Sequence, residues 1–171
     1  MEDRYLVDLE ERKVIVNGDE AVSFMSVLVL HYLAGCDGTR PTGQYLTFRE
    51  VPGGEMYYSA FKRRAIDRLA REFGRDASAL LEAGRSLDAR ELEMGDVSLE
   101  IRPFPMIPMV VIVWEGDEEI PASANILFDS IAPKILPMED LSVVGNLVAS
   151  RLVKDLHRMR ENDTPQVTGR G

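Results

Sequence analysis

The chain has 171 residues, of which 45% are hydrophobic and 29% charged, and its formal net charge at pH 7 is −9. These values are typical of one folded globular domain and exclude a chain that is disordered throughout. Because an acidic chain does not favour a basic surface over the whole molecule, we expect no nucleic acid among its partners.

The single cysteine, Cys36, limits the redox and metal chemistry of the chain. It excludes an intramolecular disulfide and cannot alone supply the four thiolates of an iron–sulfur or zinc site, so we expect no iron–sulfur cluster in this chain. Residues 1–13 lack the apolar core of a signal peptide, and no apolar run is long enough to span a bilayer. We therefore expect a cytoplasmic protein without a membrane partner.

The first half of the chain predicts a hairpin, a buried helix, a strand and an amphipathic helix. Tyr5–Leu9 and Lys13–Val16 flank a polar turn, as in a β-hairpin. Ala21–Ala34 is apolar on nearly every face, which is typical of a buried helix. Tyr45–Glu50 alternates like a strand, and Glu55–Phe73 carries apolar residues at spacings of three and four.

The second half predicts short elements before a long closing helix. Ala77–Ala83 is expected to form a short helix. Val97–Ile101 and Met109–Trp114 are expected to be strands, although the three prolines between them should limit their pairing. Asn125–Phe128 is expected to be a further strand, and Met138–Glu161 a helix with a regular apolar stripe.

These elements predict a single α+β domain over residues 1–161, followed by a disordered tail over residues 162–171. The sheet is expected to be mixed or antiparallel. Around it we expect one buried helix, one basic amphipathic helix and one long C-terminal helix.

The acidic segment after the strand that ends at Trp114 allows two interpretations. Glu115, Asp117, Glu118 and Glu119 could supply oxygen ligands to a divalent cation, with further oxygens from later in the chain, as a carboxylate-dependent metal enzyme would need. The spacing matches no known ligand motif. The other interpretation is a solvated turn whose charges keep a sheet edge unpaired. We assign no metal ligand from the sequence.

A second hypothesis uses Arg49, which lies at a strand end before a flexible glycine pair. Arg49 could clamp a carboxylate of the acidic turn, or it could hold an anionic ligand in a cleft with aromatic walls. The aromatic side chains could equally pack in the core. The candidate ligand-binding residues are Arg49, Glu50, Tyr57, Trp114, Asp117, Glu118, Glu119 and Asp129. No nucleophile–base set accompanies them, so whether the chain is an enzyme stays open.

The amphipathic helix carries a basic set that could dock an acidic partner: Lys62, Arg63, Arg64, Arg68 and Arg71. Such sets also occur as solvated helix faces with acidic neighbours one turn away. Both alternatives remain open.

The order of several motifs resembles a known family. The segments are "HYLAG", "PTGQYLTFREVPGG", "YYSAFKRRA", "WEGDEEIPASANILFD" and "LPMEDL". Together they resemble the family called domain of unknown function 3786 over roughly Ala21 to Leu141, and W-x-G-D-E-E-x-P-A is the most specific element. Some longer members carry an N-terminal iron–sulfur segment, and members occur mainly in anaerobic bacteria and archaea.

The resemblance implies a role in anaerobic metabolism, but the family has no assigned reaction that could be carried over to this chain. This chain lacks the cluster cysteines of the longer form, and Ile120 replaces the usual phenylalanine of the acidic motif. The candidate residues that coincide with family motifs include Arg49, Glu50, Trp114, Asp117, Glu118, Glu119 and Asp129. The expected function is therefore a binding or accessory module in anaerobic cofactor or redox metabolism. Its expected partner is a small molecule or a redox or cofactor protein, and its oligomeric state is open.

Overall fold

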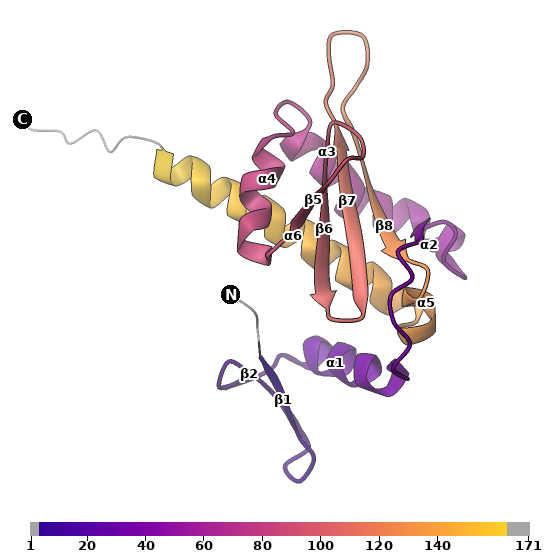
Figure 1. Ribbon diagram of the computed structural model, residues 1–171. Coiled ribbons are helices and arrows are strands. Elements are labelled where there is room, and N and C mark those ends of the chain that lie inside the picture. The colour runs from indigo at the N-terminus through magenta and orange to yellow at the C-terminus, as the bar shows by residue number, and fades with distance from the viewer. Residues whose placement is uncertain (1–3, 164–171) are drawn as a thin grey trace, which may run out of the picture.

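The computed structural model describes residues 4–163 (Figure 1). The chain begins with a small antiparallel sheet and a helix: β1 (Tyr5–Asp8), β2 (Lys13–Val16), β3 (Asp19–Glu20) and α1 (Ser23–Gly35). The predicted opening hairpin is confirmed, with Tyr5 opposite Val16 and Asp8 opposite Lys13.

A second, larger sheet forms the centre of the molecule. Its five strands follow the order β4-β8-β7-β6-β5, and every neighbouring pair is antiparallel. The strands are β4 (Tyr45–Thr47), β5 (Arg90–Leu92), β6 (Val97–Phe104), β7 (Ile107–Trp114) and β8 (Ser123–Asp129). The α+β class is confirmed, and the sheet is antiparallel rather than mixed. The edge strand β5 was not predicted.

The proline-rich connection between β6 and β7 is shorter than predicted. The ladder continues to the pair Phe104–Ile107, which leaves only Pro105 and Met106 in the turn. The expectation that the prolines limit pairing is therefore wrong. One extra residue on β6 between Ile101 and Phe104 forms a bulge opposite β7, and a bulge tolerates residues that cannot donate to the ladder.

Helices cover one face of the larger sheet, and α6 crosses behind it in Figure 1. The helices after α1 are α2 (Gly54–Phe61), α3 (Asp67–Phe73), α4 (Ala79–Gly84), α5 (Ala132–Ile135) and α6 (Met138–Asp163), and of these α3 and α4 contact the strands of the sheet directly. A π-helical segment, η1 (Lys62–Ile66), joins α2 to α3, and a short 3₁₀ turn, η2 (Arg85–Leu87), follows α4.

Both predicted amphipathic helices are confirmed. Phe61, Ala65, Leu69 and Phe73 are buried along the first, and Leu141 to Leu156 bury a stripe along the second. Of the predicted tail, residues 162 and 163 belong to α6, and residues 164–171 lie outside the described residues. None of the helices in the described residues combines the length and the low charge that crossing a bilayer requires.

The prediction of a buried helix is wrong for one face of α1. Leu28, Val29 and Tyr32 are buried, whereas Phe24, Val27, Leu30 and Leu33 are 45–53% exposed. An apolar sequence on all faces indicates burial only if neighbouring elements surround the helix. Here its main contacts are β2 and α5, so half of its circumference faces outward.

The two faces of β6 have different surroundings. Leu99 and Ile101 join the core beneath the helices, and a Cβ added at Gly84 of α4 would lie 2.3 Å from the Leu99 side chain. Because side chains alternate along a strand, Ser98 and Glu100 project from the opposite face, which the helices do not cover. This opposite face carries the charged cluster described below.

Candidate functional site

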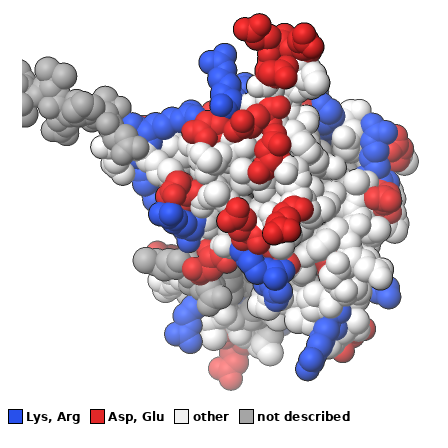
Figure 2. Space-filling view, turned by 45° about the horizontal axis from the view of Figure 1, so that its top comes forward, with Lys and Arg blue, Asp and Glu red and all other residues white. Residues whose placement is uncertain are grey.

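The acidic loop between β7 and β8 is held together by its own carboxylates. Asp117 Oδ1 accepts the backbone N–H groups of Glu119 and Ile120 at 2.8 and 2.7 Å, and these bonds lower the pKa of Asp117. Glu115 Oε1 accepts the N–H of Ala77 at 2.7 Å. Glu118 and Glu119 are exposed where the loop projects (Figures 1 and 2). This geometry agrees with a solvated turn.

Arg49 and Glu50 are engaged with near neighbours at the start of α2. The Arg49 guanidinium lies 4.0 Å above the centre of the Tyr58 ring and 3.6 Å from Glu55. Glu50 accepts hydrogen bonds from the backbone N–H and hydroxyl of Thr47, which lower the pKa of Glu50. The nearby Tyr57 is 48% exposed.

Asp129 is fully buried and ties two chain segments together. Its carboxylate accepts the N–H and hydroxyl of Thr42 and the N–H groups of Gly43 and Ile131, at 2.7–3.1 Å. Burial raises the pKa of Asp129, but these hydrogen bonds outweigh burial, so the net shift is downward. The carboxylate is thus fixed by the backbone at the end of β8.

The candidate residues from the sequence lie in three separate places. Trp114 pairs with Ser123 at one end of β8, and Asp129 is the last residue at the other end. The two ends of β8 are six residue steps apart along an extended strand, which corresponds to about 20 Å. Arg49 follows β4, whose last residue pairs with Leu127. The indole of Trp114, 37% exposed, packs against Gly95 instead.

Within residues 4–163, no group of three or more His, Cys, Asp or Glu side chains is placed to hold a metal ion. The basic set on η1 and α3 is partly paired. Lys62 bonds Asp67, Arg68 donates to Ser150, and Arg71 pairs with Glu72. The Lys62 and Arg71 contacts are those of a solvated helix face, whereas the Arg68 bond ties α3 to α6.

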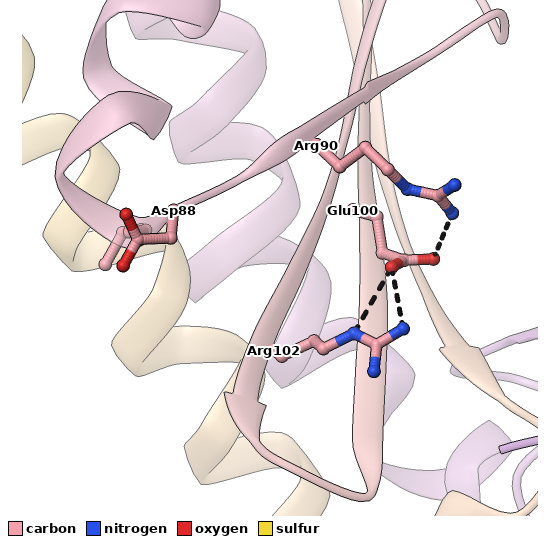
Figure 3. A pocket seen from close by; sticks show the side chains of 5 residues that line it. Asp88, Arg90, Glu100 and Arg102 are labelled. Atoms are coloured by element: carbon pink, nitrogen blue, oxygen red, sulfur yellow. Dashed lines mark hydrogen bonds and ion pairs between the residues drawn. The ribbon is translucent and has the colours of Figure 1, made fainter. Parts of the chain in front are cut away.

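The open face of the sheet carries a charged cluster that sequence reasoning missed (Figure 3). Glu100 lies on β6 directly opposite Arg90 of β5, and its side chain is only 8% exposed. Arg90 Nη2 donates to Glu100 Oε2 at 3.0 Å. Arg102 donates from Nε and Nη2 to Oε1 at 3.3 and 3.2 Å. Tyr45 donates its hydroxyl to Oε2 at 2.7 Å.

Tyr45 comes from the far edge of the sheet, so its side chain reaches across β8 and β7 to Glu100. Burial and the bond to Glu100 raise the pKa of Tyr45 to about 12, so the phenol stays protonated and donates. Burial alone raises the pKa of Glu100, but the donors from Tyr45, Arg90 and Arg102 lower it by more. Glu100 is therefore an ionised, nearly buried carboxylate.

A surface cavity of about 460 Å³ opens beside this cluster. Leu87, Asp88, Arg90, Glu100 and Arg102 line it. Asp88 has a left-handed backbone, with φ at 49°, where η2 turns into β5, and Figure 3 shows its carboxylate set apart from the two guanidinium groups. Asp is one of the few non-glycine residues that adopt this conformation readily.

The cluster presents hydrogen-bond donors to the cavity. The side chains of Arg90 and Arg102 are 68% and 57% exposed although both are anchored on Glu100. A guanidinium carries five N–H donors, and Glu100 engages one from Arg90 and two from Arg102. The remaining N–H groups suit a carboxylate or phosphate oxygen. A sequence signal existed in Glu100, a charged residue inside an apolar strand.

Comparisons with known proteins place the chain in a family. The model of the family described as "Domain of unknown function (DUF3786)" matches residues 1–151. No curated protein and no solved structure that was compared with the chain matches it. The match spans both sheets, the acidic loop, the Glu100 cluster and the first half of α6. The chain therefore belongs to the DUF3786 family.

Proposed function

We propose that this protein is a binding module that holds a small molecule by a carboxylate or phosphate group between Arg90 and Arg102. The observation that carries the proposal is the nearly buried Glu100, which fixes two exposed guanidinium groups at one cavity. An arginine that is already ordered loses less side-chain entropy when it binds a ligand, so preorganisation strengthens binding.

Each residue of the cluster has a distinct part in the proposed site. Arg90 and Arg102 supply donors and positive charge to the ligand anion. Glu100 orients both of them, and Tyr45 orients Glu100 from the far edge of the same face of the sheet. Glu100 itself is buried, so its negative charge is compensated mainly by the side chains that donate hydrogen bonds to it.

Asp88 on the same cavity sets a limit on the ligand. A second negative charge on the ligand would face this carboxylate, and like charges repel across a short distance. We therefore expect a ligand with one anionic group, whose remainder is neutral, apolar beside Leu87, or a hydrogen-bond donor toward Asp88.

The wider role rests on the family resemblance. It supports an accessory protein of cofactor or redox metabolism in the cytoplasm of an anaerobe, with the bound molecule as a cofactor, a precursor or a signal. A separate ligand site at Arg49, Glu50 and Tyr57, or at Trp114 and the acidic loop, stays a prediction. The Glu100 cluster is preferred because its cations share one cavity.

Isothermal titration of the full chain with acetate, phosphate and sulfate tests the proposal. We expect saturable binding, with Arg90→Ala and Arg102→Ala each weakening it by roughly ten- to a hundred-fold, because each removes a charged hydrogen-bond partner. Arg85→Ala is the matched control, since Arg85 is exposed on the adjoining η2 turn and pairs with Glu82 outside the cavity lining.

A variant at Asp88 sharpens the assignment. Asp88→Asn should improve binding of doubly charged sulfate more than that of acetate, because it removes the like charge. If Arg85→Ala, Arg90→Ala and Arg102→Ala all weakened anion binding equally, the weakening would come from the change in net charge alone. That result would refute a specific site. Absence of binding by every anion would refute the proposed function.

A further inference from the structure

The turn that leads from η2 into β5 has an aspartate at the position where glycine is usual. The N–H of Asp88 donates to the carbonyl of Arg85 at 3.3 Å. The N–H of Ala89 donates to the carbonyl of Gly84 at 3.2 Å. These two bonds form a Schellman motif, in which the residue just past the helix, here Asp88 with φ at 49°, has a left-handed backbone. Glycine or asparagine fills this position in most helices, so the turn itself requires no charge.

A negative charge at this position opposes the helix that precedes it. The carbonyl groups at the C-terminal end of a helix carry partial negative charge, so a cation there stabilises the helix and an anion destabilises it. The helical run from α4 through η2 ends directly before Asp88. Within residues 4–163, no hydrogen bond or ion pair engages the Asp88 carboxylate. Its charge therefore serves neither the turn nor an internal contact.

We propose that Asp88 binds the ammonium group of a ligand whose carboxylate lies between Arg90 and Arg102. The inference rests on the proposed anion site and names its ligand class, a short ω-amino acid. Asp88 lines the same cavity as the two arginines, and Figure 3 shows its carboxylate set apart from both guanidinium groups. A ligand that matches the whole cavity therefore carries opposite charges at its two ends.

The register of the sheet explains why the Asp88 carboxylate is free for a ligand. Arg90 of β5 lies opposite Glu100 of the antiparallel strand β6, so Asp88 and Arg102 both lie two residues beyond this pair, toward the same end of the sheet. Arg102 nevertheless donates two hydrogen bonds to Glu100 and forms no ion pair with Asp88. Leu87 adds an apolar wall to the cavity, which suits the methylene groups of an ω-amino acid.

Isothermal titration of the full chain with pairs of ligands of equal length tests the ligand class. The pairs combine the ω-amino acids from glycine to 6-aminohexanoate with the plain carboxylates from acetate to hexanoate. The amino group should add nothing in glycine, where one carbon separates it from the carboxylate. In a longer member it should strengthen binding by about two- to fivefold, the range for an exposed ion pair. Asp88→Asn should abolish this gain and still bind the plain carboxylates.

Glu91→Gln is the matched control. It removes the same charge from β5, but Glu91 lies opposite Leu99, on the other face of the sheet, and does not line the cavity. This variant should keep the gain from the amino group. If Glu91→Gln abolished the gain as Asp88→Asn does, the gain would reflect net charge, and the proposal would be overturned.

The titrations separate failure of the ligand class from failure of the anion site. If plain carboxylates bound through Arg90 and Arg102 but no amino group strengthened their binding, the ω-amino acid assignment would be wrong and the proposed function would stand. If neither kind of ligand bound, both would be overturned.

The stability of Asp88→Asn without ligand separates a binding role from a structural one. We expect its urea midpoint to lie above that of the wild type, because asparagine also adopts the left-handed turn and removes an anion from a helix C-terminus. Such a rise in stability at the expense of binding is common at functional sites. A lower midpoint would show that the charge of Asp88 serves the fold, and it would overturn the proposal.

Discussion

The acidic β7–β8 loop and the Glu100 cluster both gather charged side chains, but they use the charge in different ways. In the loop, Asp117 accepts backbone N–H groups of its own turn. In the cluster, Glu100 accepts side-chain donors from β4, β5 and β6, and it holds two arginines at the surface. A carboxylate bonded to its own backbone builds a turn, whereas one that orients exposed cations prepares a surface for another molecule.

Among substitutions in the cluster and the loop, Glu100→Gln should have the largest effect on stability and on anion binding. The substitution keeps the shape of the side chain but removes the charge that Arg90, Arg102 and Tyr45 share. We expect the free energy of unfolding to fall by about 1.5–3 kcal/mol, the range for hydrogen bonds to a charged group. Urea unfolding measures this change, and titration with acetate should show weaker binding because the arginines lose their anchor.

If Glu100→Gln unfolded at the wild-type urea concentration and bound acetate equally well, Glu100 would not organise the cluster. Tyr45→Phe is a milder companion variant, because it removes one donor to Glu100 and keeps the ring that crosses the sheet. Its effect on both measurements should be smaller than that of Glu100→Gln.

Acid should weaken the fold partly through Glu100. Its pKa in the folded protein lies below the ordinary value of 4.5, so its contribution is complete above that value and is lost as the pH falls through the folded pKa. Urea midpoints at about pH 6 and about pH 3 should therefore differ more in the wild type than in Glu100→Gln. Equal losses in both proteins would assign the acid sensitivity to other carboxylates, such as Asp129.

Asp117→Ala should have a smaller effect, confined to the acidic loop. It removes the acceptor for two backbone N–H groups in an exposed turn, so amide hydrogen exchange of Glu119 and Ile120 should accelerate. Acetate binding should match the wild type. A clear loss of anion or cation binding in this variant would return the loop to consideration as a site.

The double variant Glu118→Gln/Glu119→Gln should have the smallest effect. Both side chains are exposed, and substitutions at such positions usually change stability by less than about 0.5 kcal/mol. Thermal melts with and without divalent cations measure the outcome. A cation-dependent rise in melting temperature that only the wild type shows would support the metal hypothesis over the solvated turn.

Local pattern predicted the elements of this fold better than their surroundings. The spacing of Phe61, Ala65, Leu69 and Phe73 sufficed to predict a helix and its buried face. The apolar sequence of α1 also predicted a helix, but its exposure depends on the few elements that contact it, which no local pattern encodes. The length of the pairing between β6 and β7 was underestimated, because a bulge in β6 accommodates residues that cannot donate hydrogen bonds.

The acidic loop and the Glu100 cluster also differ in how much of each a local sequence pattern reveals. A dense run such as Glu115–Glu119 is conspicuous in a sequence, yet Asp117 and Glu115 bond to backbone groups. The Glu100 cluster draws Tyr45 and Arg90 from segments 55 and 10 residues away, and only the strand order and register bring them together. Because register depends on tertiary packing, the sequence could indicate Glu100 as unusual but could not name its partners.

The most direct test of the anion site is a map of backbone amide chemical shifts during titration of the ¹⁵N-labelled protein with acetate and with phosphate. We predict saturable shifts at the Arg90 and Arg102 positions of β5 and β6 and at Asp88, with the amides of residues 115–120 unchanged. Shifts centred on the acidic loop or on Arg49, with β5 and β6 unmoved, would contradict the assignment of the anion site to the Glu100 cluster.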